Sequence, residues 1–421
     1  MELASDVGPT PMQVGAILRF APGSHLTEEQ VRAALADRLL GVPRLRRRLE
    51  RTPAGCGRAI WVDDPTFDTT RHIHRIEAPD PGGEEALLSV AAGLMVEPLP
   101  SDRPLWAAWL VSGTDTDPPA LVVLFHHVLA DGIGGLAVLA QLVDGAPPTS
   151  PVPFPRPSPT RRRLARDAAV DRVRTLLRIG AAPGKLKAGL AELAPGTTPR
   201  APVSSLNRPV GRRRRVAIVR ADLTEVRSAA HRAGATVNDV MLAAVGGALG
   251  TLLAHRGEHA DRFVVSVPVS ARAQATASGV GNQVGLMPVV VPASGPRSTR
   301  LRAVAESTRR QKTAARGASA ALMAPLFRVL GALGVLRLLM EHQHRINAWT
   351  TNLRGPDTPV AFLGQSVAEV VPVTVVAGNV GIAFAMFSYA NTLTISVTVD
   401  SDAVPDLDIL VEAFRAELDT S

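Results

Sequence analysis

Residues 121–135 read LVVLFHHVLADGIGG, and this stretch decides how the rest of the chain is interpreted. Its first five residues are apolar and predict a short buried strand. His126 and His127 follow the strand directly, and Asp131 and Gly132 come four and five residues after His127. Apolar residues at helical spacing then occupy 136–143. A strand therefore leads into a loop that carries imidazole, carboxylate and glycine, and loops held by rigid elements commonly carry catalytic groups.

An imidazole with a pKa near ~6.5 can take a proton from a hydroxyl and return it later, which is worth roughly 10²–10⁴-fold in rate. Neighbouring residues leaving a strand point to opposite sides, so only one of His126 and His127 can readily face a given channel. The other would support the loop. Asp131 is expected to fix the loop by accepting backbone N–H bonds or by pairing with an arginine. Adjacent histidines are poorly spaced for chelation, so no metal is expected; the remaining alternative is a hydrogen-bonded pair of loop histidines.

The sequence HHVLADG at 126–132 resembles the HHxxxDG signature of the coenzyme A-dependent acyltransferase superfamily. That superfamily includes chloramphenicol acetyltransferases, carnitine acyltransferases, peptide-synthetase condensation domains and the bacterial wax ester synthase/diacylglycerol acyltransferases. Pro104, Leu105 and Trp106, some twenty residues earlier, resemble the Pro-Leu-Trp element of the last family. By that resemblance they help to shape an acyl pocket. A tryptophan that merely packs at a strand entrance explains them equally well.

Three further candidates come from the second half of the chain. Asn238 lies in the stretch TVND at 236–239, ahead of an apolar helix, and resembles the family's second motif. It is expected either to supply an amide donor to the site or only to cap the helix. Ser270 and Asn282 lie in segments that also resemble the family, and they are candidates for binding the developing oxyanion, where electrostatic catalysis gains most. The resemblance continues to the C-terminus, but the short N-terminus lacks the family's Ser-Pro-x-Asp-x-x-Phe segment.

Composition limits the classes of function. A chain of 421 residues predicts two domains. Its single cysteine excludes an internal disulfide and indicates a reducing compartment. No signal peptide is visible at the N-terminus, so a cytoplasmic protein is expected. The net charge of +8 is carried mainly by arginine, but only 4% of residues are aromatic, which argues against a nucleic-acid partner.

One proline-rich segment and three basic segments stand out along the chain, and two of the basic segments have two interpretations. Prolines crowd residues 145–159 and predict a stiff linker. Residues 161–193 are basic and amphipathic, which fits either a helix packed on the protein or one lying on an anionic membrane. Arginines at 212–215 would be a solvated run or a site for coenzyme A phosphates. Those at 44–48 are expected to be solvated.

Together these observations predict an α/β (α+β) fold of two chloramphenicol-acetyltransferase-like domains with a channel between them. The expected boundaries are 1–145, a linker and crossover at 146–204, and 205–421. The resemblance implies an O-acyltransferase that uses acyl-CoA as co-substrate, needs no cofactor, and esterifies diacylglycerol or a long-chain alcohol with His127 as general base. A peripheral membrane surface on the inner face, or a lipid droplet, is a further expected partner. The alternatives are a condensation-type enzyme that uses a carrier-protein thioester and a catalytically silent lipid-binding homologue.

Overall fold

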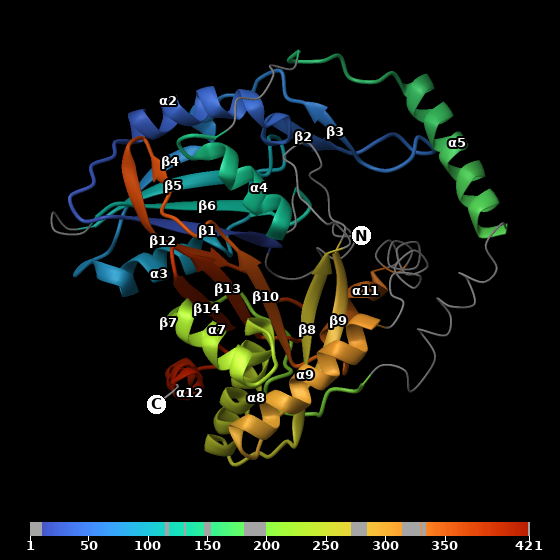
Figure 1. Cartoon of the computed structure of the whole chain (residues 1–421). Helices are drawn as coiled ribbons and strands as arrows, with labels where there is room; N and C mark the ends of the chain where they lie inside the picture. Colours follow the sequence, from blue (N-terminus) through green and yellow to red (C-terminus); the bar gives the residue numbers. More distant parts are fainter. Residues whose placement is uncertain are drawn as a thin grey trace.

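The chain forms two six-stranded sheets with helices packed on them (Figure 1). The structure, a computed structural model, describes residues 11–113, 118–129, 132–146, 153–180, 199–270, 284–313, 330 and 334–419. The mixed α/β character and the two sheet domains agree with the fold predicted from the sequence.

The first sheet has the strand order β11-β12-β1-β6-β5-β4. Its central strand β6 pairs antiparallel with β1 and β5, whereas β4 pairs parallel with β5. The strands are β1 (Gln13–Phe20), β4 (Ile73–Glu77), β5 (Trp106–Ser112), β6 (Ala120–His126), β11 (Ala361–Phe362) and β12 (Gln365–Val373). A hairpin of β2 (Arg47–Glu50) and β3 (Ile60–Asp63) lies beside this sheet, and short 3₁₀ turns span Leu39–Gly41, Pro43–Arg46 and Thr69–Arg71.

Side chains of β6 alternate between two cores, as a strand covered on both faces requires. Leu121, Val123 and Phe125 share one apolar cluster with α2 (Glu28–Arg38) and α4 (Gly132–Leu142). Val122 and Leu124 pack in a second cluster with α3 (Gly83–Leu94). Every residue of β6 is buried. The apolar stretch at 121–125 is therefore part of a middle strand of a sheet that is covered on both faces.

The second sheet has the order β7-β14-β13-β10-β8-β9. Its strands are β7 (Arg214–Asp222), β8 (Arg262–Ser270), β9 (Val284–Pro292), β10 (Ala348–Arg354), β13 (Ile382–Tyr389) and β14 (Thr392–Asp400). Its helices are α7 (Leu223–Arg232), α8 (Val237–His255), α9 (Arg297–Thr313), α11 (Val335–Glu341) and α12 (Leu407–Leu418). Within the described part of the chain, α8 alone is long and apolar enough to cross a membrane, and 72% of its most apolar window is buried in the protein.

The second half contributes strands β11 and β12 to the first sheet. β12 belongs by sequence to the second half, but it pairs with β1, placing Val373 opposite Gly15, and so extends the first sheet. The predicted boundaries at 145 and 205 stay a prediction, and they do not indicate that β12 joins the first sheet. An alternating strand pattern tells which residues face a core, but it does not tell which strand lies alongside.

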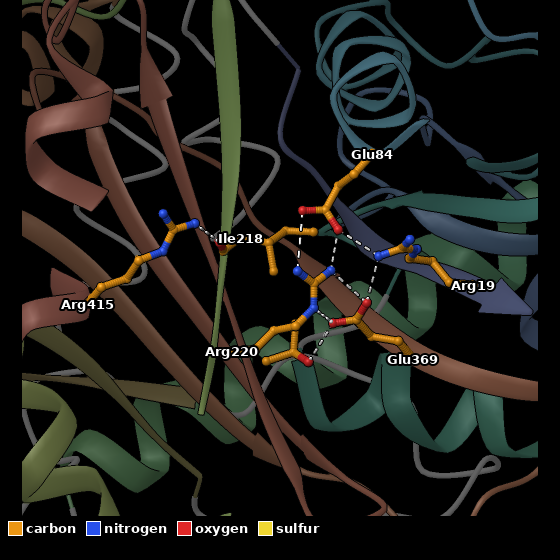
Figure 2. A network of polar contacts seen from close by, with 7 residues as sticks. Arg19, Glu84, Ile218, Arg220, Glu369 and Arg415 are labelled. Carbon is orange, nitrogen blue, oxygen red and sulfur yellow. Dashed lines mark hydrogen bonds and ion pairs between the residues drawn. The ribbon is translucent and has the colours of Figure 1, made fainter. Parts of the chain in front are cut away.

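Four charged side chains join the halves where the sheets meet (Figure 2). Arg19 on β1 contacts Glu84 on α3 at 2.6 Å and Glu369 on β12 at 3.0 Å. Arg220 on β7 reaches the same two acids, with its Nε 2.7 Å from Glu369. Burial alone would raise the pKa of Glu369, but hydrogen bonds and charge from Arg220 outweigh it and hold that pKa below its usual value. Each acid thus bridges two arginines.

We expect Arg220→Ala to lower the free energy of unfolding by roughly 1–3 kcal/mol, because it leaves Glu84 and Glu369 with one arginine fewer in a partly buried site. The matched control is Arg75→Ala, which breaks an exposed pair with Glu77 at 3.6 Å and should cost well under about 1 kcal/mol. Urea unfolding in low and high salt measures both. Equal losses in the two variants would contradict a special role for the network.

Candidate active site

His126 is the last residue of β6 and lies opposite Gln13 of β1. Its backbone N–H donates to the carbonyl of Leu105 at 2.9 Å, and its own carbonyl accepts from Leu129 at 2.8 Å. The ring is buried, and its Nδ1 accepts the backbone N–H of Val128 at 3.1 Å. This acceptor role leaves the proton of the neutral imidazole on Nε2. His126 therefore stabilises the turn that follows the strand.

His127 is the more accessible of the two histidines. It is the first residue of the turn and is half-buried, whereas the His126 side chain is only 6% exposed. Its backbone N–H donates to the carbonyl of Met12 at 2.7 Å, which ties the turn to the start of β1. The backbone on both sides of the histidine pair is thus held by the segments that lead into β5 and β1, and the role of His127 as general base stays a prediction.

The structure places Pro104, Leu105 and Trp106 beside the histidine turn. All three are buried, and the Leu105 carbonyl receives the N–H of His126. Trp106 lies opposite Phe125 in the β5–β6 ladder, and its indole N–H donates to the carbonyl of Leu45 at 2.7 Å. The indole also borders an apolar cavity of about 30 Å³ between the sheet and α4. The packing role and a pocket-shaping role both remain consistent with this position.

Helix α4 fixes the far side of the turn. It begins at Gly132, four residues before the helix predicted from spacing, and it contacts β10 of the second sheet. A Cβ on Gly135 would lie 2.3 Å from the Phe125 ring, so this glycine lets the helix approach β6 closely. Asp131 lies outside the described residues, and its predicted role in fixing the loop stays a prediction.

Two buried polar residues near the turn were not predicted from the sequence. Gln13 is 1% exposed; its amide N donates to the Glu97 carbonyl, and no hydrogen bond reaches its Oε1 among the described residues. Its position directly across from His126 makes it a neighbour of the turn. A glutamine inside an apolar strand was the available signal, but spacing alone does not show which strand lies opposite.

His72 is the second of these residues. His72 and His74 alternate with apolar residues, a pattern that by itself indicates a polar strand face, but His72 is 1% exposed and stacks on Trp106 with ring centroids 4.6 Å apart. Its Nδ1–H donates to the Trp106 carbonyl at 2.8 Å. Burial lowers the pKa of His72 to about 4, with smaller lowering by Arg103 and Arg71.

This pKa predicts a specific acid sensitivity. The unfolded chain binds a proton at His72 below about pH 6.5, whereas the folded protein does so only below about 4, so the free energy of unfolding should fall by about 3 kcal/mol as pH drops across that window. His72→Gln should remove most of this loss. Urea unfolding at pH 7.5, 6, 5 and 4 measures it. An unchanged pH profile in the variant would contradict the prediction.

Of the candidate site residues in the second half, the structure describes the position of only some. Thr236 caps α8 and forms a reciprocal capping box with Asp239, whose other oxygen accepts from Thr308 at 2.7 Å. Asn238 is therefore not the cap; it is half-buried in the first turn, and its role as an amide donor stays a prediction. Ser270 is the last residue of β8, but its side chain, like all of Asn282, lies outside the described residues.

Three of the four arginines at 212–215 pair with acids. Arg213 pairs with Asp402, Arg214 with Asp400 at 3.3 Å, and Arg215 with Asp408 at 3.1 Å. The Arg214 and Asp400 side chains are only 2% and 1% exposed. Carboxylates brought by the chain's C-terminal part thus neutralise three of these arginines. The acids lie nearly 190 residues away, which is why the sequence pattern did not reveal them.

The arginines at 44–48 are also not simply solvated. Arg44 lies over the Trp61 ring at 3.8 Å, and Arg46, 5% exposed, lies over Phe154 at 4.2 Å. Arg47 donates to Asp63 at 2.8 Å. These contacts fasten the β2–β3 hairpin and the linker to the first half. In the described ranges, no group of three or more potential ligands is arranged to hold a metal ion.

Two family models match the chain. The catalytic-domain model of the wax ester synthase/diacylglycerol acyltransferases matches residues 2–241, and the family's C-terminal-domain model matches residues 280–420. The chain belongs to the wax ester synthase/diacylglycerol acyltransferase family. Together the two models cover the histidine turn and every strand of the two sheets except β8, so this member is an acyltransferase of that type.

Relatives agree with this assignment over most of their length. A Mycobacterium tuberculosis protein named as a diacylglycerol O-acyltransferase is 32% identical over 408 residues, covering 94% of this chain and 88% of its own. The solved wax ester synthase/diacylglycerol acyltransferase of Marinobacter aquaeolei shares the fold with a TM-score of 0.68 at 21% identity, covering 97% of this chain and 93% of that one. The first condensation domain of the calcium-dependent antibiotic synthetase shares it at 0.60 and 20% identity, over 99% and 93%.

Proposed function

We propose that this wax ester synthase/diacylglycerol acyltransferase family member transfers a long acyl chain from coenzyme A to the hydroxyl of a diacylglycerol or a long-chain alcohol. The family and the names of the mycobacterial relatives support the acyl transfer and the diacylglycerol. The observation that carries the chemistry is the division of roles between the two histidines. His126 is committed to the turn through its Nδ1, and His127 is the half-buried imidazole beside it.

In the proposed reaction, the His127 ring takes the proton of the acceptor hydroxyl as its oxygen attacks the thioester carbon. The tetrahedral oxyanion then collapses, the carbon–sulfur bond breaks, and the imidazolium returns the proton to the departing thiolate. Ester and free coenzyme A are the products, and the histidine ends neutral as it began. Asn238, Ser270 and Asn282 are proposed as donors to the oxyanion, and Asp131 as the residue that fixes the loop.

A carrier-protein thioester is the alternative acyl donor, because condensation domains share the fold. The family-model match to the wax ester synthases over both halves favours free acyl-CoA. For the location we propose the cytoplasm, with contact to a membrane or lipid droplet where both lipid substrates would be found.

An acceptor screen tests the proposal. Radiolabelled palmitoyl-CoA, or the same acyl group on a carrier protein, is incubated with diacylglycerol, a long-chain alcohol or neither, and the lipids are separated. We expect label in triacylglycerol or wax ester from palmitoyl-CoA. Label transferred only from the carrier would support the condensation-type alternative, and binding of acyl-CoA without any product would support a silent homologue.

A further inference from the structure

Helix α5 (Arg161–Gly180) extends away from both sheets at the edge of the molecule (Figure 1). It follows the proline-rich linker and contacts the loop between β2 and β3. The guanidinium of Arg172 donates to the Gly55 carbonyl at 3.1 Å, and the Cys56 thiol lies 3.8 Å from the carbonyl of Arg161. Ala168 is close enough that its Cβ would lie 3.3 Å from a Cβ on Gly57.

These contacts define which side of α5 faces the protein. Leu164, Ala168 and Arg172 are spaced four residues apart and therefore share one face of the helix. Leu164 and Ala168 are also half-buried, whereas the other side chains of α5 that the structure describes are exposed. The helix thus packs on the β2–β3 loop along this single line.

The opposite side of α5 carries an exposed apolar stripe. Val170, Val173 and Leu177 are spaced three and four residues apart, so they form one row along the helix. Their exposed fractions are 41%, 55% and 66%, which increase toward the C-terminal end. Large apolar side chains on a helix normally face a core. Here they face away from the contacts with the protein.

Exposed arginines flank the stripe on both sides. At 100° per residue, Arg162 lies on one side of the stripe and Arg163 and Arg174 on the other, while Arg166 lies in line with it toward the N-terminal end; all four are exposed. The helix contains seven arginines against two aspartates. Asp167 lies 3.8 and 3.7 Å from Arg163 and Arg166, and the two aspartates still leave five of the seven arginine charges of the helix uncompensated. An apolar row bordered by arginines complements a surface that is anionic and apolar just beneath its charges.

We infer that α5 is a docking surface for an anionic phospholipid bilayer, with Val170, Val173 and Leu177 inserted at the level of the acyl chains and the flanking arginines at the phosphates. Long arginine side chains reach headgroups while their stems stay beside apolar side chains. A narrow row of three side chains gives little apolar area for a stable protein interface, which needs on the order of 800 Å² per partner. Electrostatic attraction to anionic lipid, by contrast, adds up over each arginine.

Vesicle flotation tests the inference without acyl donor or acceptor, so its outcome is independent of the proposed function. The full-length protein is mixed with vesicles of phosphatidylcholine alone or with about 30% phosphatidylglycerol, at low and high salt. We expect flotation with the anionic vesicles at low salt, and a loss of about tenfold or more in bound fraction at high salt. Equal binding to neutral vesicles, or no binding to anionic ones, overturns the inference.

Matched variants assign the binding to α5. Replacing Arg162, Arg163, Arg166 and Arg174 by glutamine should reduce binding about tenfold or more. Replacing the exposed arginines 75, 232, 302 and 345 by glutamine removes the same charge elsewhere and should leave binding within about twofold.

The apolar stripe is tested at unchanged charge. The double variant Val173→Ser/Leu177→Ser should weaken binding, whereas Val203→Ser, at a side chain 84% exposed outside α5, should not. Equal effects of helix and control variants would show that only net charge matters and would overturn the assignment.

Discussion

Gly15→Ala is expected to leave little folded protein. Gly15 lies in β1 opposite Leu124 of β6, and a Cβ at this position would be 1.9 Å from the Val123 carbonyl oxygen and 2.9 Å from its carbon. These are backbone atoms of the central strand, so no side-chain rotation relieves the clash. Either β1 separates from β6 or the ladder shifts, and both disrupt the pairing of Gln13 with His126 at the site. Far-ultraviolet circular dichroism and thermal unfolding of the variant measure the effect.

Gly93→Ala is the matched control, because the same chemical change is made in the same half. Gly93 lies in α3, and a Cβ there meets nothing within 4 Å. Alanine favours a helix over glycine by about 1 kcal/mol, so this variant should be as stable as the parent or slightly more so. A stable, active Gly15→Ala protein would show that β1 and β6 do not approach as closely as described.

His127→Ala is expected to reduce ester formation by roughly 10²–10⁴-fold while the protein stays folded. The fold is spared because the turn is held by the backbone N–H groups of His126 and His127 and by the His126 ring, none of which needs the His127 side chain. Single-turnover ester formation from labelled palmitoyl-CoA measures the rate, and thermal unfolding checks that the variant is intact.

His126→Ala separates the two histidines. It removes the acceptor for the Val128 N–H, so it should lower the free energy of unfolding by roughly 1–3 kcal/mol as well as activity. The assigned roles would be contradicted if His127→Ala lowered stability but kept the rate of ester formation, and His126→Ala lowered that rate but kept stability.

Local signals in the sequence predicted local structure well. Thr27–Gln30 and Thr236–Asp239 have the spacing of a capping box, and both form one at the start of α2 and α8; residues 223–232, which Gly234 follows as a helix-ending glycine, form α7. The apolar run before the histidines is β6. These features depend on hydrogen bonds and periodicity within a few residues, which the sequence contains directly.

Features that depend on distant partners were missed or misjudged. The arginines near 214 meet acids at 400–408, β12 joins a sheet built mostly from the first half, and His72 is buried under Trp106 rather than on a polar face. In each case the residue type was visible, but its neighbour was set by the topology. The same holds for the candidate site. The histidine turn was recognisable from its motif, whereas the position of Gln13 next to that turn depends on the pairing of β1 with β6.

The most direct test of the central claim is to count coenzyme A thiol and ester product in one reaction of the unmodified protein with palmitoyl-CoA, with and without diacylglycerol or a long-chain alcohol. We expect thiol release to depend on the alcohol and one ester to form for each thiol released. Thiol release at the same rate without any alcohol, or none with every acceptor, would contradict it.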